Sequence, residues 1–237
     1  MEYATVAPLG SIIDDIERDF FTADRYKYIL EGLQVTIEVT LIGLVIGLIL
    51  GVIIGAITSL HQLNGSLKIP DKICKLYITV IRGTPTTIQL LIIYFIVFAS
   101  LSFHQVIIAG IAFGFNSGAY VAEIMRAGIN SVPKGQFEAS ASLGLPTDVT
   151  MSSVILPQAF RNILPALCNE GITLLKETSI CGYIGLMDLT RAGNIIRAQT
   201  FDAFVPLIAV ALIYLIMVLG LSYLVKRLER RLNANAI

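Results

Sequence analysis

The chain alternates long apolar stretches with short stretches that carry most of its charges. Five apolar stretches approach or exceed the roughly 20 residues that a helix needs to cross a hydrocarbon core. This pattern predicts an all-α integral membrane protein with about five transmembrane helices, in which residues 28–230 form the membrane domain, residues 1–27 an N-terminal segment and residues 231–237 a tail. The expected spans are residues 28–60, 85–101, 105–127, 162–186 and 203–225.

Composition agrees with a lipid environment. Hydrophobic residues make up 55% of the chain and charged residues 14%, against roughly 25% charged in a soluble globular domain. The first 21 residues are polar and acidic and lack the features of a secretory signal, so we expect the first span to act as the insertion signal. Isolated cysteines favour buried thiols over a disulfide or a metal site; they are Cys74, Cys168 and Cys181.

Basic residues gather in two of the charged stretches. Between the first two spans, four basic residues stand against one acid, Asp71, and after the fifth span four stand against Glu229. Because positively charged loops remain in the cytoplasm, this distribution predicts an extracytoplasmic N-terminal segment and a cytoplasmic C-terminus. The basic residues are Lys68, Lys72, Lys75 and Arg82, followed by Lys226, Arg227, Arg230 and Arg231.

The first span carries a glycine at every fourth position. Residues four apart share one helix face, so these glycines form a smooth groove into which another helix can pack closely. We expect this groove to be a helix-packing face, for example at a dimer interface. The glycines are Gly43, Gly47, Gly51 and Gly55.

Residues 130–160 are the least apolar part of the middle of the chain, yet they are patterned. Helix-forming residues at 136–143 predict a short helix, and the glycine and proline that follow predict the turn that ends it. A second helix is expected to start with Thr147 or Asp148 as its N-cap and to be interrupted near Pro157. The stretch therefore predicts a cytoplasmic helix–turn–helix.

Several residues of this stretch resemble the EAA loop of ABC-importer permeases, in which Glu-Ala-Ala is followed after three residues by Gly and after nine more by Ile-x-Leu-Pro. The matching residues are Glu138-Ala139-Ser140, Gly144 and Val154-Ile155-Leu156-Pro157. Ser140 and Val154 depart from the motif by small or conservative replacements. The spacing fits throughout.

Other stretches resemble the polar amino-acid branch of these permeases, which transports histidine, arginine or glutamine. The likeness extends over about residues 28–230. It rests on Arg82-Gly83-Thr84-Pro85 with Gln89-Leu90, Ser117-Gly118-Ala119-Tyr120 with Ala122-Glu123-Ile124, Leu156-Pro157-Gln158-Ala159, and Leu175-Lys176-Glu177-Thr178-Ser179.

The resemblance implies a type I ABC-importer fold and a set of partners. In the family, the EAA segment is a coupling helix that sits in a groove of a separate cytoplasmic ATPase, which binds ATP and Mg. No Gly-x-x-x-x-Gly-Lys-Ser/Thr loop occurs in this chain, so we expect no cofactor here and no ATPase activity of its own. The residues expected to couple to the ATPase are Glu138, Ala139, Ser140, Gly144 and Leu145.

Further partners implied by the resemblance are a second copy or a paralogous permease, an extracytoplasmic solute-binding protein and an amino-acid substrate. The location implied is the bacterial cytoplasmic (inner) membrane. No nucleic-acid partner is indicated.

Ionisable groups within spans are candidates for function because they are costly to bury in lipid. Glu170, Thr173 and Glu177 recur at i, i+3 and i+7 and so share one helix face. A lone carboxylate in a dehydrated pathway favours a cationic side chain, so we predict a basic amino acid as substrate, although Glu170 could equally receive the α-ammonium group of any amino acid. Asn116 and Ser117 interrupt the third span and either line the path or accept a neighbouring helix.

Three other readings of the sequence are weighed against the importer. An ion-gradient-driven secondary transporter would require inverted repeats with paired broken helices, and no internal repeat is found. A membrane-embedded enzyme would require clustered catalytic or metal-ligating side chains, and the sequence holds no His, Cys or Asp cluster. A non-substrate-binding assembly subunit is opposed by the polar face around Glu170. We therefore expect no catalytic residues and no metal site.

Overall fold

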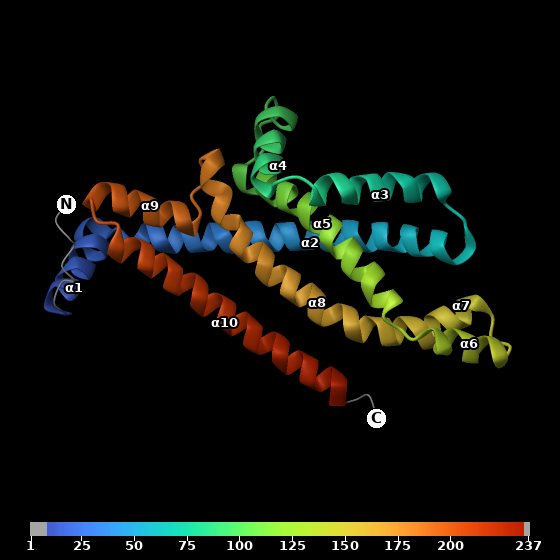
Figure 1. Ribbon diagram of the computed structural model, residues 1–237. Helices are drawn as coiled ribbons and strands as arrows, with labels where there is room; N and C mark the ends of the chain where they lie inside the picture. Colours follow the sequence, from blue (N-terminus) through green and yellow to red (C-terminus); the bar gives the residue numbers. More distant parts are fainter. Residues whose placement is uncertain (1–8, 235–237) are drawn as a thin grey trace, which may run out of the picture.

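The computed structural model describes residues 9–234, and within them every regular element is helical. The predicted N-terminal segment and tail thus lie partly outside the described residues. The α-helices are α1 (Leu9–Ile16), α2 (Tyr26–Asn64), α3 (Lys68–Arg82), α4 (Thr86–Ile92), α5 (Gln105–Asn130), α6 (Lys134–Ser142), α7 (Thr147–Val149), α8 (Leu156–Glu177), α9 (Leu189–Thr200) and α10 (Phe204–Ala234) (Figure 1).

Three helices in the described chain are long and apolar enough to cross a membrane: residues 26–62 of α2, α5, and residues 204–231 of α10. A fourth candidate is a bent pair in which α3 meets α4 and the π-helical turn Ile93–Val97 at 108°. The all-helical membrane fold is therefore confirmed, with three to four candidate spans.

Two of the predicted spans differ in detail. Residues 85–101 are only the second half of the bent pair, because Gly83 and Pro85 end α3 and turn the chain. The stretch 162–186 divides into α8 and a 3-10 helix, Thr178–Ile184. Helix α8 is not among the span candidates, and its polar residues account for its lower apolarity.

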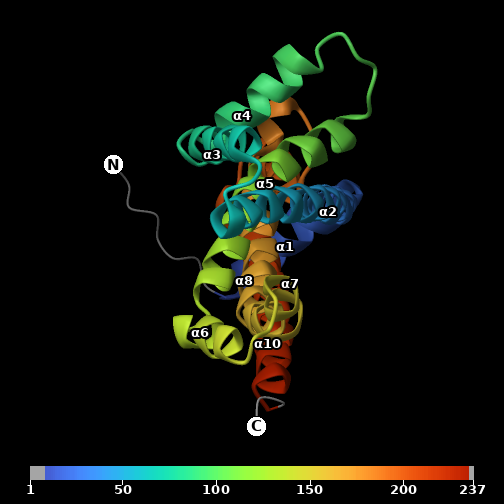
Figure 2. The ribbon, with the colours of Figure 1, turned by 90° about the vertical axis from the view of Figure 1, so that its right-hand side faces the viewer.

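Helices α2 and α5 interlock along the glycine groove. A Cβ atom at Gly47 would lie 2.8 Å from the Cβ of Ser117, and one at Gly51 would lie 2.3 Å from Cγ1 of Val121. The packing is reciprocal, because a Cβ at Gly114 of α5 would lie 2.5 Å from Ile46 of α2. The predicted packing face is thus confirmed, and its neighbour is a helix of the same chain (Figure 2).

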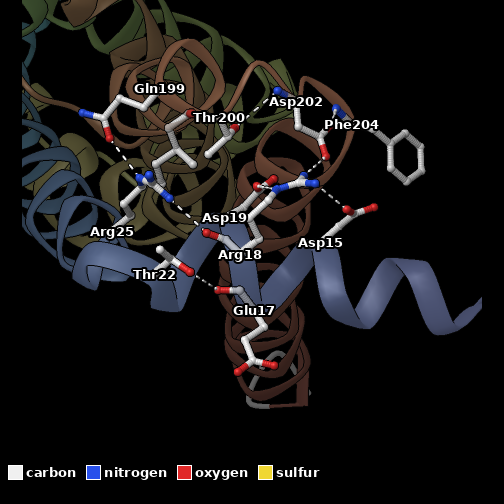
Figure 3. Close-up of polar contacts among 11 residues, drawn as sticks. Asp15, Glu17, Arg18, Asp19, Thr22, Arg25, Gln199, Thr200, Asp202 and Phe204 are labelled. Atoms are coloured by element: carbon white, nitrogen blue, oxygen red, sulfur yellow. Dashed lines mark hydrogen bonds and ion pairs between the residues drawn. The ribbon is translucent and has the colours of Figure 1, made fainter.

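Arg18 ties the N-terminal segment to the turn between α9 and α10 (Figure 3). Its guanidinium nitrogens contact carboxylate oxygens of Asp15 at 2.8 Å, Asp19 at 2.9 Å and Asp202 at 2.9 Å. The hydrogen bond to Asp19, whose side chain is fully buried, raises the pKa of Arg18 above its usual value. Arg25 adds a second tie, since its Nε donates to Oε1 of Gln199 at 3.1 Å.

The α6–α7 hairpin lies at the opposite end of the molecule from α1 and α9 (Figure 1). It corresponds to the segment predicted to be cytoplasmic, whereas α1 belongs to the segment predicted to be extracytoplasmic. Helix α8 connects the two ends and packs against both α5 and α10.

Candidate functional site: a polar helix face and a coupling hairpin

Glu170 on α8 forms a pair with Ser117 on α5. The Ser117 hydroxyl donates a hydrogen bond of 2.8 Å to Oε1 of Glu170, and Ser117 is fully buried, whereas Glu170 is half-buried. Within the described residues 9–234, no salt bridge reaches Glu170. Its carboxylate can therefore accept further hydrogen bonds or a cation.

The other predicted members of the α8 face differ in exposure. Thr173 is exposed, and its hydroxyl donates to the backbone carbonyl of Asn169 at 3.1 Å. Glu177 is half-buried two turns beyond Glu170, while Lys176 is exposed and forms no salt bridge within the described part of the chain. The helix thus presents two carboxylates along one face, and neither is neutralised by an ion pair among the described residues.

Asn116 lies beside Ser117 but faces a different neighbour. Its side-chain amide donates to Oε1 of Gln89 on α4 at 2.9 Å, and only 2% of Asn116 is exposed. In a single chain, Asn116 and Ser117 are therefore bound to protein groups and do not line an open surface. The sequence singled out Gln89 only as part of a motif, and no local pattern predicted its contact with Asn116.

The hairpin predicted to couple to an ATPase is a short helix closed by a glycine turn. Gly144 has a φ of +70°, a conformation that favours glycine because a Cβ atom would crowd the backbone of the residue itself. The amide of Gly144 donates to the carbonyl of Ala141 at 2.9 Å, and that of Leu145 donates to the carbonyl of Ser140 at 3.1 Å. This pair of bonds is the Schellman motif, which satisfies the last carbonyls of α6.

The residues of α6 divide into an inner and an outer set. Ser140 is 3% exposed, and half-buried Phe137 packs against a core cluster that includes Val132 and Ile155. Glu138 and Ala139 are exposed. Of the predicted coupling residues, Ser140 thus faces inward, Leu145 is half-buried, and the outer surface belongs to Glu138, Ala139, Gly144 and also Leu143, which is 78% exposed.

Two local predictions about the second helix were wrong. The N-cap of α7 is Pro146, without a side-chain cap hydrogen bond, and not Thr147 or Asp148. The helix is not interrupted at Pro157, because a π-helical stretch, Thr150–Ile155, runs directly into α8 and places Pro157 in the first turn of α8.

A membrane-embedded helical fold with an acidic helix face and an exposed, glycine-closed hairpin is consistent with a transport permease. Comparison with known families makes this specific: residues 33–234 match the family described as "Binding-protein-dependent transport system inner membrane component". The chain belongs to this family. It is the inner-membrane permease component of an ABC amino-acid importer and not its ATPase, and the family implies a complex with ATPase subunits.

Individual relatives agree with this family assignment. The chain is 42% identical to the arginine transport system permease protein ArtQ of Bacillus subtilis (strain 168) over 90% of this chain and 96% of that protein. It is 42% identical to the glutamine transport system permease protein GlnP of Escherichia coli (strain K12) over 70% of this chain and 77% of that protein.

Solved structures agree as well. A crystal structure of an amino acid ABC transporter with histidines matches with a TM-score of 0.81 and 38% identity, covering 96% of this chain and 100% of the matched one. The MetNI methionine ABC transporter in an inward-facing conformation matches with a TM-score of 0.74 at 20% identity, over 86% of this chain and 96% of that one, which shows a shared fold.

Proposed function

We propose that this permease conducts a basic amino acid and that Glu170 receives the substrate's positive charge. The observation that supports this most directly is the half-buried Glu170 carboxylate, which has one hydrogen bond, from Ser117, and no ion pair within residues 9–234. A guanidinium or ammonium group placed there forms an ion pair that offsets part of the cost of removing both charges from water. Thr173 and Glu177 extend the same face.

The relatives named above fit this proposal without deciding it. ArtQ, which aligns with nine-tenths of the chain, is named for arginine, and the crystal structure with a TM-score of 0.81 is of an amino acid ABC transporter with histidines. GlnP, named for glutamine, is equally identical over a shorter stretch. An acidic residue on the pathway is the feature that favours a cationic substrate over a neutral one.

The working unit we propose contains two permeases, two copies of this chain or this chain with a paralogue. In one chain, Thr173 and Lys176 are exposed on α8, and a second permease placed against this face would enclose them. An extracytoplasmic binding protein would deliver the amino acid. The outer surface of α6 would dock into the ATPase.

Transport into proteoliposomes tests the substrate. The permease is reconstituted with its co-purified ATPase and binding protein, and uptake of labelled arginine and glutamine is measured with ATP supplied on the ATPase side. We expect arginine to be accumulated over glutamine and Glu170→Gln to remove this preference. Glu38→Gln is the matched control, because Glu38 is held by Gln34 within α2, its Oε1 2.7 Å from the Gln34 amide.

Equal arginine uptake by Glu170→Gln and the parent would contradict the substrate assignment and leave the importer intact. It would also favour the alternative in which this chain is the half of a heterodimer that does not bind substrate.

The docking surface is tested separately. Leu143 protrudes from the hairpin with 78% of its surface exposed, so it is the apolar side chain of this outer surface that a docked ATPase would bury. We expect Leu143→Asp to lower the amount of ATPase that co-purifies with the permease. Leu101→Asp serves as control, because Leu101 is exposed in a turn remote from the hairpin. Unchanged ATPase recovery would place the docking surface elsewhere.

A further inference from the structure

The break between α3 and α4 leaves backbone groups that need hydrogen-bond partners. Helix α3 ends at Arg82, α4 begins at Thr86, and the two helices bend by 108°. Carbonyl groups at the end of a helix have no partner in the next turn, and a free carbonyl inside a membrane is costly. A break of this kind therefore requires a side chain that satisfies it.

Gln89 is that side chain. Its Nε2 lies 2.7 Å from the carbonyl oxygen of Ile81, 3.0 Å from that of Thr84 and 2.8 Å from the Thr84 hydroxyl oxygen, so its two hydrogens are shared among these three acceptors. Gln89 belongs to α4 and is 8% exposed, whereas its partners belong to the end of α3 and to the turn. A single amide thus joins the two arms of the bend across the break.

The other end of the same amide is joined to α5. Asn116 donates to Oε1 of Gln89 at 2.9 Å, and Ser117, the next residue, donates to Glu170 at 2.8 Å. The two consecutive residues of α5 therefore face two different helices. A hydrogen-bonded path runs from the bend through α5 to the acidic residue of α8.

The end of α3 is held to α5 by a separate set of contacts. The Tyr77 hydroxyl donates to the backbone carbonyl of Phe115, and the Arg82 guanidinium carbon lies 5.4 Å from the centre of the Tyr120 ring. Arg82 Nη1 also lies 3.9 Å from Oε2 of Glu123. Since these contacts fix α3, the orientation of α4 depends on the polar contacts of Gln89 and on apolar packing.

We propose that Gln89 is a positioning residue for transport: it sets the angle between α3 and α4 and, through Asn116, couples this angle to the Ser117–Glu170 pair. Only an amide can serve both ends, because it donates two hydrogens and accepts at its oxygen. The thioether of methionine provides no donor and only a weak acceptor at this position. The proposal depends on the transport activity of the family and not on which amino acid is carried.

Distances between the arms of the bend test the positioning role directly. Spin labels are attached at Val80→Cys in α3 and Ile96→Cys in the π-helical turn after α4, which are 50% and 71% exposed, after Cys74, Cys168 and Cys181 are replaced by Ala. Distances are measured by pulsed electron paramagnetic resonance on the full complex in nanodiscs without substrate.

Gln89→Met is expected to broaden the distance distribution between the two labels. Gln34→Met is the matched control: it makes the same replacement within α2, where Gln34 donates to Oε1 of Glu38 at 2.7 Å, and it should leave the distribution unchanged. An unchanged distribution in Gln89→Met would overturn the proposal whatever happens to uptake.

Transport supplies the second readout. We expect Gln89→Met to lower the maximal uptake rate roughly tenfold while the concentration of loaded binding protein giving half-maximal uptake stays the same, since an unpaired buried group commonly costs about a factor of ten. Because the two amides act as one unit, Gln89→Met combined with Asn116→Leu should be no worse than either change alone. Additive losses would overturn the coupling to Asn116.

Gln89→Asn serves as a control for a folding defect, because it keeps the amide group on a side chain that is one methylene shorter. If neither Gln89 variant assembles with the ATPase while Gln34→Met does, Gln89 has a stability role only and the proposal is wrong. The distance measurement uses no substrate, so its outcome is independent of the test of Glu170.

Discussion

Gly51 of α2 and Val121 of α5 touch so closely that a Cβ atom at position 51 would lie 2.3 Å from Cγ1 of Val121. Helices in lipid associate through close packing more than through the hydrophobic effect. We expect Gly51→Val to lower the free energy of unfolding by roughly 1–3 kcal/mol, the usual cost of overpacking. Thermal unfolding in detergent measures it. Gly220→Val is the control, since a Cβ at Gly220 meets nothing within 4 Å, and equal melting temperatures for the two variants would refute the prediction.

The glycine turn of the coupling hairpin gives a second prediction. Gly144 has a φ of +70°, and a residue with a side chain pays about 1–2 kcal/mol to adopt the left-handed region. Gly144→Val should therefore distort the end of α6 and reduce ATP-driven uptake more than ATP hydrolysis. The control is Gly135→Val, because Gly135 has an ordinary φ and open space around its Cβ position. If both variants transport equally well, the turn is not needed for coupling.

Arg18 anchors the N-terminal segment, so its removal should free that segment without affecting the transmembrane helices. Arg18→Met deletes the contacts with Asp15, Asp19 and Asp202 and leaves the buried Asp19 carboxylate without its cation. We expect faster hydrogen exchange over residues 17–24, with exchange in α5 unchanged. Arg197→Met, which removes an exposed arginine that forms no salt bridge within residues 9–234, is the control. Unaltered exchange over residues 17–24 would show that apolar packing alone holds the segment.

The carboxyl group of Asp188, which lies between the predicted spans, should make the stability of the protein depend on pH. Its carboxylate caps α9 by accepting from the amide of Thr190 at 2.9 Å, but it is fully buried, and burial raises its pKa from 3.8 to about 6. Between these two values the folded state holds a proton that the unfolded state has lost. The contribution of this group to stability therefore falls as pH rises from about 4 to about 6.

Substituting Asp188 isolates that contribution. The amide of Asp188→Asn keeps an oxygen that can cap α9, but it cannot ionise. The melting temperature of the variant minus that of the parent should therefore be higher at pH 7.5 than at pH 4.5. Asp188→Ala, which removes the cap, should lower the melting temperature at both pH values. A difference between Asp188→Asn and the parent that is independent of pH would show that the carboxyl does not titrate in this range.

The sequence predicted those features that depend on local periodicity. The glycines of α2 recur every fourth residue, so a packing face followed from helix geometry alone. The helix–turn–helix of the coupling hairpin was predicted in the same way, because Gly144 and Pro146 stand between two helix-forming stretches. What the periodicity of one helix could not identify was its partner, and the groove is filled by α5 of the same chain and not by another subunit.

The predictions that failed involve the paths of the broken helices. The 108° bend at Gly83–Pro85 joins α3 and α4 into one candidate span, yet the amphipathic residues of α3 made it read as a loop. Asn116 was expected either to line the pathway or to accept a neighbouring helix, and both stand as predictions; its bond to Gln89, which joins residues 27 positions apart, was not predicted. Such contacts follow from the three-dimensional path of the chain, which local patterns do not encode.

The reciprocal packing of α2 and α5 limits how the permease can move. Four glycines of α2 and three of α5 each receive a side chain of the other helix at backbone depth: Gly43, Gly47, Gly51 and Gly55, and Gly110, Gly114 and Gly118. Sliding along the axis is therefore possible only in steps of four residues, about 6 Å for an α-helix. Smaller shifts would drive Val121 or Ile46 into a neighbouring turn. The two helices therefore behave as one rigid unit, and we expect any rocking of the permease to take place where this unit packs against α3, α8 and α9.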